Sequence, residues 1–278
     1  MGDFTRRGRS VFLIINCDPI RLVTKACDGC ACKTYYPLKG KVSVVSLRGE
    51  IKIQLSARLR WPVTRHFPQG VHFARDFRRF FPELEMRNIF DVGAHHGESA
   101  TEYSILYPLA RIDSFEPVRA SFAEMQRRTV GNPRIHCHNL ALGSRREEST
   151  MDTSAGHSSM FKISDHGDER ITVVTAADFC REKRIDRINF LKVDTEGFDL
   201  EVLYGAQTLI EDAAIDLIEV EAGMNPENDI HVYFDKFTSY LYGYGYRIFG
   251  IYEQGPEGPT NSAKLRRSNI IFASPSLV

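Results

Sequence analysis

The sequence predicts an α/β fold built on a mostly parallel β-sheet. From residue 88 onward, apolar runs of about five residues alternate with amphipathic segments, which is the rhythm of parallel strands joined by helical crossovers. The last two apolar runs, 246–253 and 268–274, have only a turn-rich segment between them. Because this segment leaves no room for a helical crossover, the two runs should pair antiparallel. A chain of 278 residues, of which 42% are hydrophobic, can bury a full core.

Residues 1–81 are predicted to form a separate lobe that acts as a cap or as the contact of a homodimer. Within it, residues 41–56 alternate apolar and polar side chains around a central Arg-Gly pair, which is the pattern of a β-hairpin. Residues 72–87 carry apolar side chains at helical spacing up to Pro82, so a short helix should lead into the next domain. We therefore expect a small β-containing lobe followed by one domain over residues 82–278.

The second domain is predicted to alternate strands and helices along its length. The strands are predicted at 88–94, 111–117, 134–142, 188–197, 214–222, 246–253 and 268–274. The helices between them are predicted at 97–107, 118–130, 199–211 and 231–243. Residues 153–170 are rich in Ser, Gly and charged residues, so they are predicted to be a mobile loop.

The segment IFDVGAHHGE, residues 89–98, joins the first of these strands to a helix. Ligands of open α/β sheets bind beyond the carboxyl ends of the strands, so Asp91 and Gly93 should border a binding site. Gly93 and Gly97 would let the backbone curve tightly and come close to a ligand. The second strand ends on Glu116, 25 positions after Asp91, where a carboxylate can accept both hydroxyls of a ribose. The pattern therefore predicts a site for a nucleoside cofactor.

Two classes of nucleoside cofactor fit these features. Nicotinamide dinucleotides favour a G-x-G-x-x-G loop, which this segment lacks because its glycines are Gly93 and Gly97. S-adenosylmethionine carries an ammonium and a sulfonium, and Asp91 would balance such positive charge. The missing dinucleotide loop and the acid at Asp91 together favour S-adenosylmethionine as the cofactor, and therefore methyl transfer. The alternatives are an NAD-dependent oxidoreductase and a cofactor-binding scaffold without catalysis.

Later segments strengthen the methyltransferase interpretation. After DVGAHHGE and SFEP, the chain contains INFLKVDTEGFDLEVLYGA (188–206), LIEVE (217–221) and RRSNIIF (266–272), in that order. Together these motifs resemble the FkbM family of S-adenosylmethionine-dependent methyltransferases over roughly residues 86–275. The resemblance implies a seven-stranded, Rossmann-like methyltransferase sheet with an antiparallel C-terminal strand, and S-adenosylmethionine as the cofactor.

The predicted cofactor site lies along the ends of neighbouring strands. The resemblance implies cofactor contacts at Asp91, Gly93, Gly97 and Glu116, and the predicted set is completed by Ala94, His96, Asn139, Ala141 and Asp194. The side-chain amide of Asn139 could reach the adenine edge. His95 and His96 replace an Asn and an aliphatic residue that are more common in the family. Because they are adjacent in sequence, their side chains should point in different directions.

Acidic residues at the ends of the fourth and fifth strands are the predicted catalytic groups. Methyl transfer is an in-line displacement, so holding the acceptor in line supplies much of the rate, and a base helps when the acceptor is a hydroxyl. Asp194 and Glu196 end the fourth strand, where Lys192 shares a strand face with Asp194, and Glu221 lies near the end of the fifth. These four residues are the catalytic candidates. His157, in the predicted loop, could close over the acceptor.

Composition and motifs also limit the partners. The resemblance suggests a hydroxyl on a sugar, glycolipid or other small metabolite as the methyl acceptor. The formal net charge is zero, and no basic stripe is interleaved with aromatic residues, so no nucleic-acid partner is predicted. No apolar run approaches the roughly 18–20 residues of a membrane span, and the chain is predicted to act in the cytoplasm. Cys27, Cys30 and Cys32 lack the spacing of a zinc site, so no metal is predicted.

Overall fold

The computed structural model describes residues 11–14, 21–24, 69–153, 162–163, 166–228, 230–256 and 264–278 of the protein. The chain divides into two compact units, Met1–Leu55 and Ser56–Val278. In the first unit, β1 (Val11–Ile14) pairs antiparallel with β2 (Arg21–Thr24). The hairpin predicted at 41–56, the three clustered cysteines and His157 lie outside the described residues.

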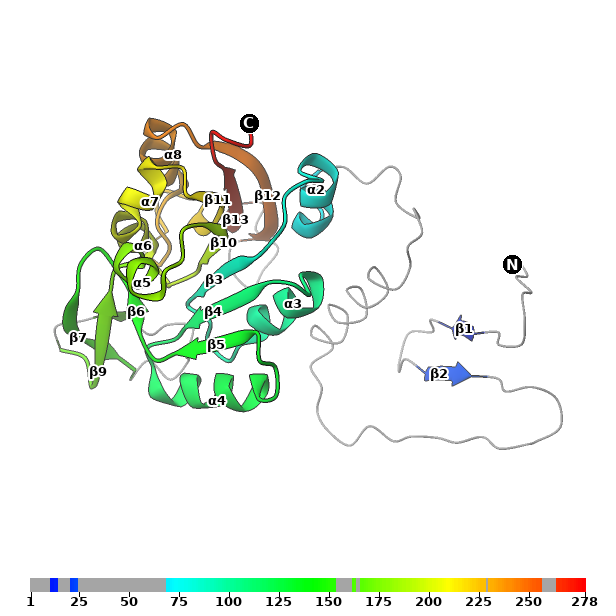
Figure 1. Ribbon diagram of the computed structural model, residues 1–278, viewed down its shortest axis with the longest axis horizontal. Coiled ribbons are helices and arrows are strands. Elements are labelled where there is room, and N and C mark those ends of the chain that lie inside the picture. The colour runs from blue at the N-terminus through cyan, green and yellow to red at the C-terminus, as the bar shows by residue number, and fades with distance from the viewer. Residues whose placement is uncertain are drawn as a thin grey trace. The chain divides into compact units, whose positions relative to one another are not determined.

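The second unit is built on a seven-stranded sheet with helices on both faces (Figure 1). Its strands are β3 (Asn88–Val92), β4 (Arg111–Phe115), β5 (Ile135–His138), β10 (Ile188–Val193), β11 (Ile215–Gly223), β12 (Arg247–Pro256) and β13 (Leu265–Ala273). They lie in the order β12-β13-β11-β10-β3-β4-β5, and the neighbours from β11 to β5 are parallel. β13 is antiparallel to both β11 and β12. The mostly parallel sheet and the antiparallel final pair are therefore confirmed.

Apolar side chains from the helices pack on both faces of the sheet. The helices are α2 (Phe73–Phe80), α3 (Glu98–Leu106), α4 (Arg119–Thr129), α5 (Ala176–Lys183), α6 (Asp199–Gly205), α7 (Gln207–Glu211) and α8 (Phe234–Gly243). On one face, Phe77 of α2 and Tyr103 of α3 each place a ring centroid 5.5 Å from that of Phe190 in β10. On the other face, Phe179 of α5 packs against Phe90 of β3. No helix in the described ranges is long and apolar enough to cross a membrane.

The short helix predicted ahead of Pro82 is present as α2, but it packs with the second unit. Phe77 contacts Phe190 of the central sheet, and the Tyr252 hydroxyl of β12 donates to Asp76 Oδ2 at 3.0 Å. The helix ends just before Pro82, which disfavours a helical conformation at the residue that precedes it. The domain predicted to begin at residue 82 therefore also includes the helix that was assigned to the N-terminal lobe.

A four-stranded sheet follows β5 in the chain, and the sequence did not predict it. Its strands are β6 (Ala141–Leu142), β7 (Glu147–Asp152), β8 (Lys162–Ile163) and β9 (Glu169–Val174), in the order β6-β9-β7-β8. The strand predicted over 134–142 is interrupted at Asn139 and Leu140, so its two ends belong to different sheets. Strand β7 reads EESTMD, which has little of the apolar alternation of a half-buried strand.

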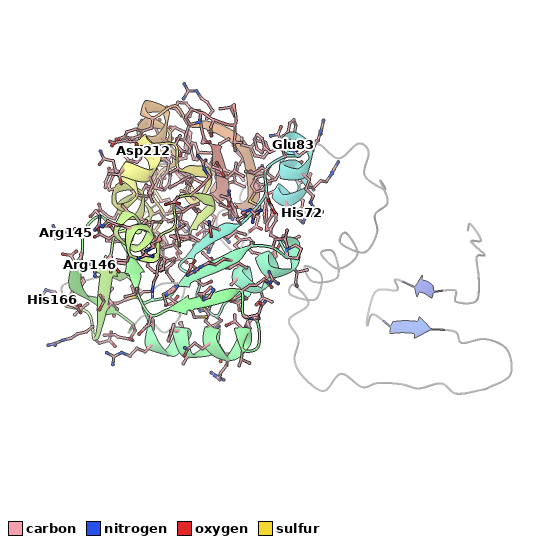
Figure 2. The ribbon with its side chains drawn as sticks, viewed as in Figure 1. His72, Glu83, Arg145, Arg146, His166 and Asp212 are labelled. Carbon is pink, nitrogen blue, oxygen red and sulfur yellow. The ribbon has the colours of Figure 1, made fainter. Side chains whose placement is uncertain are left out.

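The small sheet has one apolar and one solvated side. Met151 and Val173 pack with Val118 in a small hydrophobic cluster, and Val118 immediately precedes α4. Arg145, Arg146 and His166, which lie in turns between the strands of the small sheet, are exposed at the outer edge of the second unit (Figure 2). The apolar side therefore faces the ends of the main strands, where it forms one wall of the site.

Candidate active site

The loop after β3 is tied to both neighbouring strands. Gly93 has φ +77, and a Cβ on it would lie 1.8 Å from the backbone oxygen of Asp194, which follows β10. The backbone N–H groups of Gly93 and Ala94 donate to the Phe115 carbonyl at 3.1 and 3.0 Å. Gly97, also at positive φ, leads into α3. The ends of β3, β4 and β10 therefore meet at this loop, and glycine is required at Gly93 for close approach.

Glu116 follows β4, and its carboxylate is held by two backbone N–H groups. His95 donates to Oε2 and Val118 donates to Oε1, both at 2.9 Å. Burial nevertheless raises the pKa of Glu116 to about 7. Asn139 donates its amide hydrogens to the carbonyls of Glu116 and Pro117, at 3.0 and 2.7 Å. Asn139 therefore supports the backbone that carries Glu116.

A cavity of about 260 Å³ opens between this loop, the end of β10 and the small sheet. It is lined by Val92, Gly93, His95, Phe115, Glu116, Pro117, Val118, Ser121, Leu140, Ala141, Leu142, Met151, Ile163, Asp194, Thr195, Glu196 and Phe198. Of the residues predicted to contact the cofactor, four line the cavity: Gly93, Glu116, Ala141 and Asp194. The others are not part of the lining: Asp91, Ala94, His96, Gly97 and Asn139. His95 lines the cavity, although it was not in that set.

Asp91 lies in a row of charged side chains across the sheet. Strand register places Lys192 opposite both Asp91 and Glu219. Lys192 Nζ lies 3.4 Å from Asp91 Oδ1 and 3.1 Å from Asp194 Oδ2. Burial raises the pKa of Asp91 despite the nearby Lys192 charge, and burial raises that of Glu219 to about 8. The sequence predicted that Asp91 would face the positive charge of a cofactor. In the structure, Asp91 faces the positive charge of Lys192.

The turn after β10 presents Asp194 and Glu196 to the cavity. Asp199, at the start of α6, accepts the backbone N–H groups of Thr195 at 3.2 Å and Gly197 at 3.1 Å. Glu196 has φ +53, a left-handed conformation that is uncommon for a residue with a side chain. Burial and the Asp194 charge raise the pKa of Glu196. Asp199 was not among the predicted residues, since an acid in the first turn of a helix is too common to single out.

Glu221 lies at the end of β11 in contact with two residues that the sequence did not single out. His231 Nε2 lies 2.9 Å from Glu221 Oε2, and the Arg267 guanidinium contacts Glu221 Oε1. Arg267 lies on β13, which pairs with β11. His231 lies in the segment between β11 and α8, which folds back so that the Gly223 N–H donates to the Val232 carbonyl. Glu196 lies close to Glu221 and His231. One carboxylate oxygen of Glu196, one of Glu221 and one ring nitrogen of His231 lie within 4.8 Å of one another.

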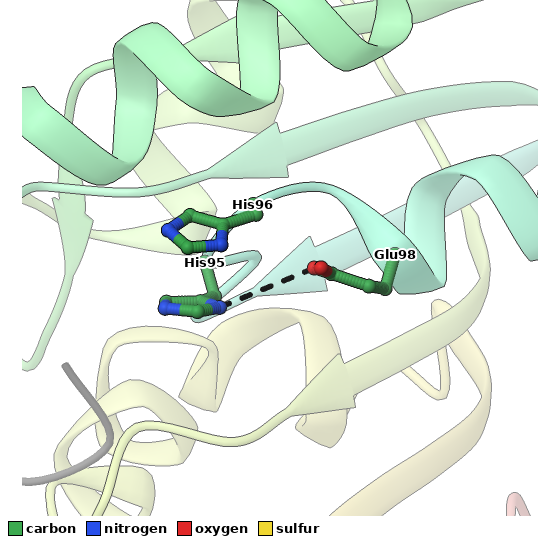
Figure 3. Close-up of side chains that lie close together, drawn as sticks. All are labelled: His95, His96 and Glu98. Carbon is green, nitrogen blue, oxygen red and sulfur yellow. Dashed lines mark ion pairs between the residues drawn. The ribbon is translucent and has the colours of Figure 1, made fainter. Parts of the chain in front are cut away.

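The adjacent histidines of the β3 loop do not diverge as predicted. Their rings stack with centroids 3.6 Å apart and an interplanar angle of 25° (Figure 3). His95 Nδ1 lies 4.0 Å from Glu98 Oε2, and Arg128 pairs with the other oxygen of Glu98 at 2.8 Å. The stacking follows from the left-handed backbone at His95, φ +48, which changes the direction of its side chain. Burial and the His96 charge lower the pKa of His95.

Comparison with known proteins gives a family for this fold and site. A family model described as the methyltransferase FkbM domain matches residues 91–248, which is more than half of the chain. This chain belongs to the FkbM methyltransferase family. The match confirms the resemblance of the sequence motifs, and with it S-adenosylmethionine as the cofactor of the family.

Individual relatives of this FkbM methyltransferase are distant. Hexuronic acid methyltransferase AglP of Haloferax volcanii is 26% identical over 145 residues, which cover 50% of this chain and 58% of AglP. Aeropyrum pernix fibrillarin, solved with S-adenosyl-L-methionine, is 13% identical with a TM-score of 0.41, covering 73% of this chain and 74% of that chain. TrmK of M. capricolum, solved with S-adenosyl-homocysteine, is 9% identical with a TM-score of 0.41, covering 68% and 62%. The family match, not these distant likenesses, identifies the chain.

The cavity of this FkbM methyltransferase has groups that suit S-adenosylmethionine. The Glu116 carboxylate can accept ribose hydroxyls, and the apolar wall of Leu140, Leu142 and Met151 suits a flat adenine. The acids that follow β10 also line the cavity, and their negative charge suits the positive charges of the methionine portion. We therefore expect Glu116 to hold the ribose and this wall to hold the base.

Cofactor affinity should depend on pH through Glu116. Its pKa of about 7 means that raising the pH through 7 ionises the carboxylate, which then accepts two hydroxyls at once. Affinity for S-adenosylhomocysteine should therefore rise between about pH 6 and about pH 8, by about tenfold at most for one titrating group. Calorimetry at both pH values measures this. Glu116→Gln should bind more weakly and lose the pH dependence, and an unchanged slope in that variant would assign it to another group.

Proposed function

We propose that this chain methylates a hydroxyl group of a sugar, free or within a glycolipid or other small metabolite, with S-adenosylmethionine as the donor. The observation that carries the proposal is that Asp194 and Glu196 line the same cavity as Glu116. Carboxylates that can accept a proton therefore lie beside the groups expected to hold the cofactor. This juxtaposition is what methyl transfer to a hydroxyl requires.

The chain's own residues would position the acceptor and take its proton. Bound S-adenosylmethionine supplies a methyl group on a positively charged sulfur. Lys192 Nζ, 3.1 Å from Asp194 Oδ2, fixes the direction of that carboxylate. Burial raises the pKa of Glu196, which brings it closer to the range in which a carboxylate exchanges a proton with a hydroxyl near neutral pH. We propose that one of these two carboxylates accepts the proton of the hydroxyl and that the other aligns the acceptor.

A sugar is the acceptor class best supported by the relatives. AglP is a hexuronic acid methyltransferase by name, and its match to this chain extends over half of the chain. A sugar presents several hydroxyls, which suits a site lined by the carboxylates of Glu116, Asp194 and Glu196, because these groups accept hydrogen bonds. A carrier lipid or a larger glycan would extend beyond the cavity without changing the chemistry at the hydroxyl.

A panel of acceptors tests this proposal. The purified chain is incubated with methyl-labelled S-adenosylmethionine and, separately, with a hexuronic acid glycoside, a neutral hexose glycoside, a glycolipid and single-stranded RNA. Mass spectrometry of each product locates the added methyl group. We expect label on at least one sugar and none on RNA. Label on RNA alone would contradict the sugar proposal, and cofactor binding without transfer to any acceptor of the panel would indicate a scaffold.

A further inference from the structure

A second cluster of metal-ligating side chains lies next to the cavity, formed by Glu196, Glu221 and His231. The residues come from three parts of the chain: the turn after β10, the end of β11 and the segment before α8. One carboxylate oxygen of each glutamate and one ring nitrogen of His231 lie within 4.8 Å of one another. Two ligands bound to the same ion can be no farther apart than about twice a metal–ligand bond of roughly 2.1 Å. The cluster can therefore close on an ion with small side-chain movements.

The cluster is buried on one side and reaches the cavity on the other. Glu221 is 7% exposed and His231 is 6% exposed, whereas Glu196 is part of the cavity lining. Arg267 contacts Glu221 through Oε1, and Oε2 is the oxygen 2.9 Å from His231 Nε2. The guanidinium therefore occupies one oxygen of Glu221 and leaves the other beside the imidazole.

His231 carries an unsatisfied polar atom. Its Nδ1 is buried and has no hydrogen-bond partner among the residues that the structure describes. A buried ring nitrogen without a partner costs free energy, and a neutral imidazole nitrogen is a common ligand of divalent metals. Nε2, the ring nitrogen that lies 2.9 Å from Glu221 Oε2, faces the cluster, so it is the nitrogen that would bind an ion there.

The local charge also favours a cation. Asp194 lies two residues before Glu196, and its nearest cation, Lys192, is shared with Asp91. Arg267 contacts Glu221, and the charge of Arg266 acts on the cluster at His231. A divalent ion between Glu196 and Glu221 would compensate the remaining carboxylates, and mixed carboxylate and imidazole ligands suit Mn²⁺ and Zn²⁺.

We propose that Glu196, Glu221 and His231 hold a divalent cation, and that this cation binds oxygen atoms of the sugar acceptor beside the cofactor. The second part rests on the proposed function. Neighbouring hydroxyls of a sugar, or a hydroxyl and a carboxylate of a uronic acid, can bind a cation through two oxygens. The ion would then orient the acceptor through those oxygens, in addition to the protein's own contacts.

Calorimetry with Mn²⁺ tests the cation site without an activity measurement. The full chain is stripped with a chelator and titrated with Mn²⁺ alone. We expect a single strong site, and we expect Glu221→Gln and His231→Gln each to weaken it by about 100-fold or more, because even outer partners of metal ligands are worth 10–100-fold. Glu219→Gln is the matched control, since Glu219 is a buried acid two positions earlier on the same strand. It should bind Mn²⁺ like the wild type.

S-adenosylhomocysteine binding, measured on the same samples, separates the possible failures. Variants that bind it normally are folded, so their loss of Mn²⁺ is specific to the cluster. If the wild type binds S-adenosylhomocysteine but not Mn²⁺, or if the two cluster variants bind Mn²⁺ as tightly as Glu219→Gln, the cation site is overturned and the proposed function stands. If the wild type binds Mn²⁺ but not S-adenosylhomocysteine, the proposed function fails and the cation site stands.

Discussion

Asp194→Asn and Glu196→Gln should keep the fold and most of the cofactor affinity, while methyl transfer falls by about 10²–10⁴-fold for at least one of them. Both carboxylates line the cavity, and the changes remove charge and basicity while preserving shape. The backbone of the turn should stay in place because Asp199 holds it through Thr195 and Gly197. Turnover with labelled cofactor, affinity for S-adenosylhomocysteine and thermal melting are measured for each variant.

Glu148→Gln is the matched control for these two changes. Glu148 is exposed on β7 and accepts a hydrogen bond from Thr172 Oγ1, which glutamine can also accept, so activity and melting should not change. The catalytic assignment is wrong if Asp194→Asn and Glu196→Gln both retain near-normal turnover and melt earlier than Glu148→Gln. These acids would then be structural groups whose loss costs about 0.5–2 kcal/mol, as the loss of a helix cap does.

Gly93→Ala should remove both stability and activity. The new Cβ would lie 1.8 Å from the Asp194 carbonyl oxygen and 2.8 Å from its carbonyl carbon, and neither backbone atom can move without shifting the end of β10. The left-handed backbone at Gly93 costs about 1–2 kcal/mol for alanine, and overpacking adds about 1–3 kcal/mol. Displacing Asp194 by about 1 Å would also cost about 10²-fold in rate. Denaturant unfolding and turnover measure the two effects.

Gly131→Ala isolates the contribution of backbone conformation. Gly131 has φ +85, and a Cβ there would meet nothing within 4 Å. This variant should therefore be destabilised only by the cost of a left-handed backbone for alanine. The difference between the two variants measures how tightly the β3 loop is packed against Asp194. If Gly93→Ala is no less stable than Gly131→Ala and remains active, the loop does not fix the position of Asp194.

Much of the main sheet could be predicted because its strands are short and strongly apolar. The run INFLKV becomes β10, in which every residue is buried, and the brief link between the last two apolar runs required an antiparallel pair. The small sheet could not be predicted in the same way. Its strand β7 has one buried residue, Met151, and its pairing with β9 depends on contacts that local periodicity does not contain.

The sequence could predict those residues of the candidate site that directly follow a strand. Glu116 and Asp194 follow the last residues of β4 and β10, so the chain's local pattern was sufficient to place both in the cavity lining. Arg267 was missed because it meets Glu221 only through the pairing of β13 with β11. His231 was missed because the segment after β11 folds back onto the end of that strand, where the Gly223 N–H donates to the Val232 carbonyl. The stacked histidines were predicted wrongly because the left-handed backbone at His95 is a tertiary effect of the loop.

The central claim is that the cavity bordered by Gly93 and Glu116 binds S-adenosylmethionine. Calorimetry of the purified chain with S-adenosylhomocysteine and, separately, with NAD tests it most directly. We predict that S-adenosylhomocysteine binds, that Glu116→Ala weakens this binding by about 10–100-fold through the loss of hydrogen bonds to a charged group, and that NAD gives no signal. Tight binding of NAD without binding of S-adenosylhomocysteine, or an affinity for S-adenosylhomocysteine that is unchanged in Glu116→Ala, would contradict the account.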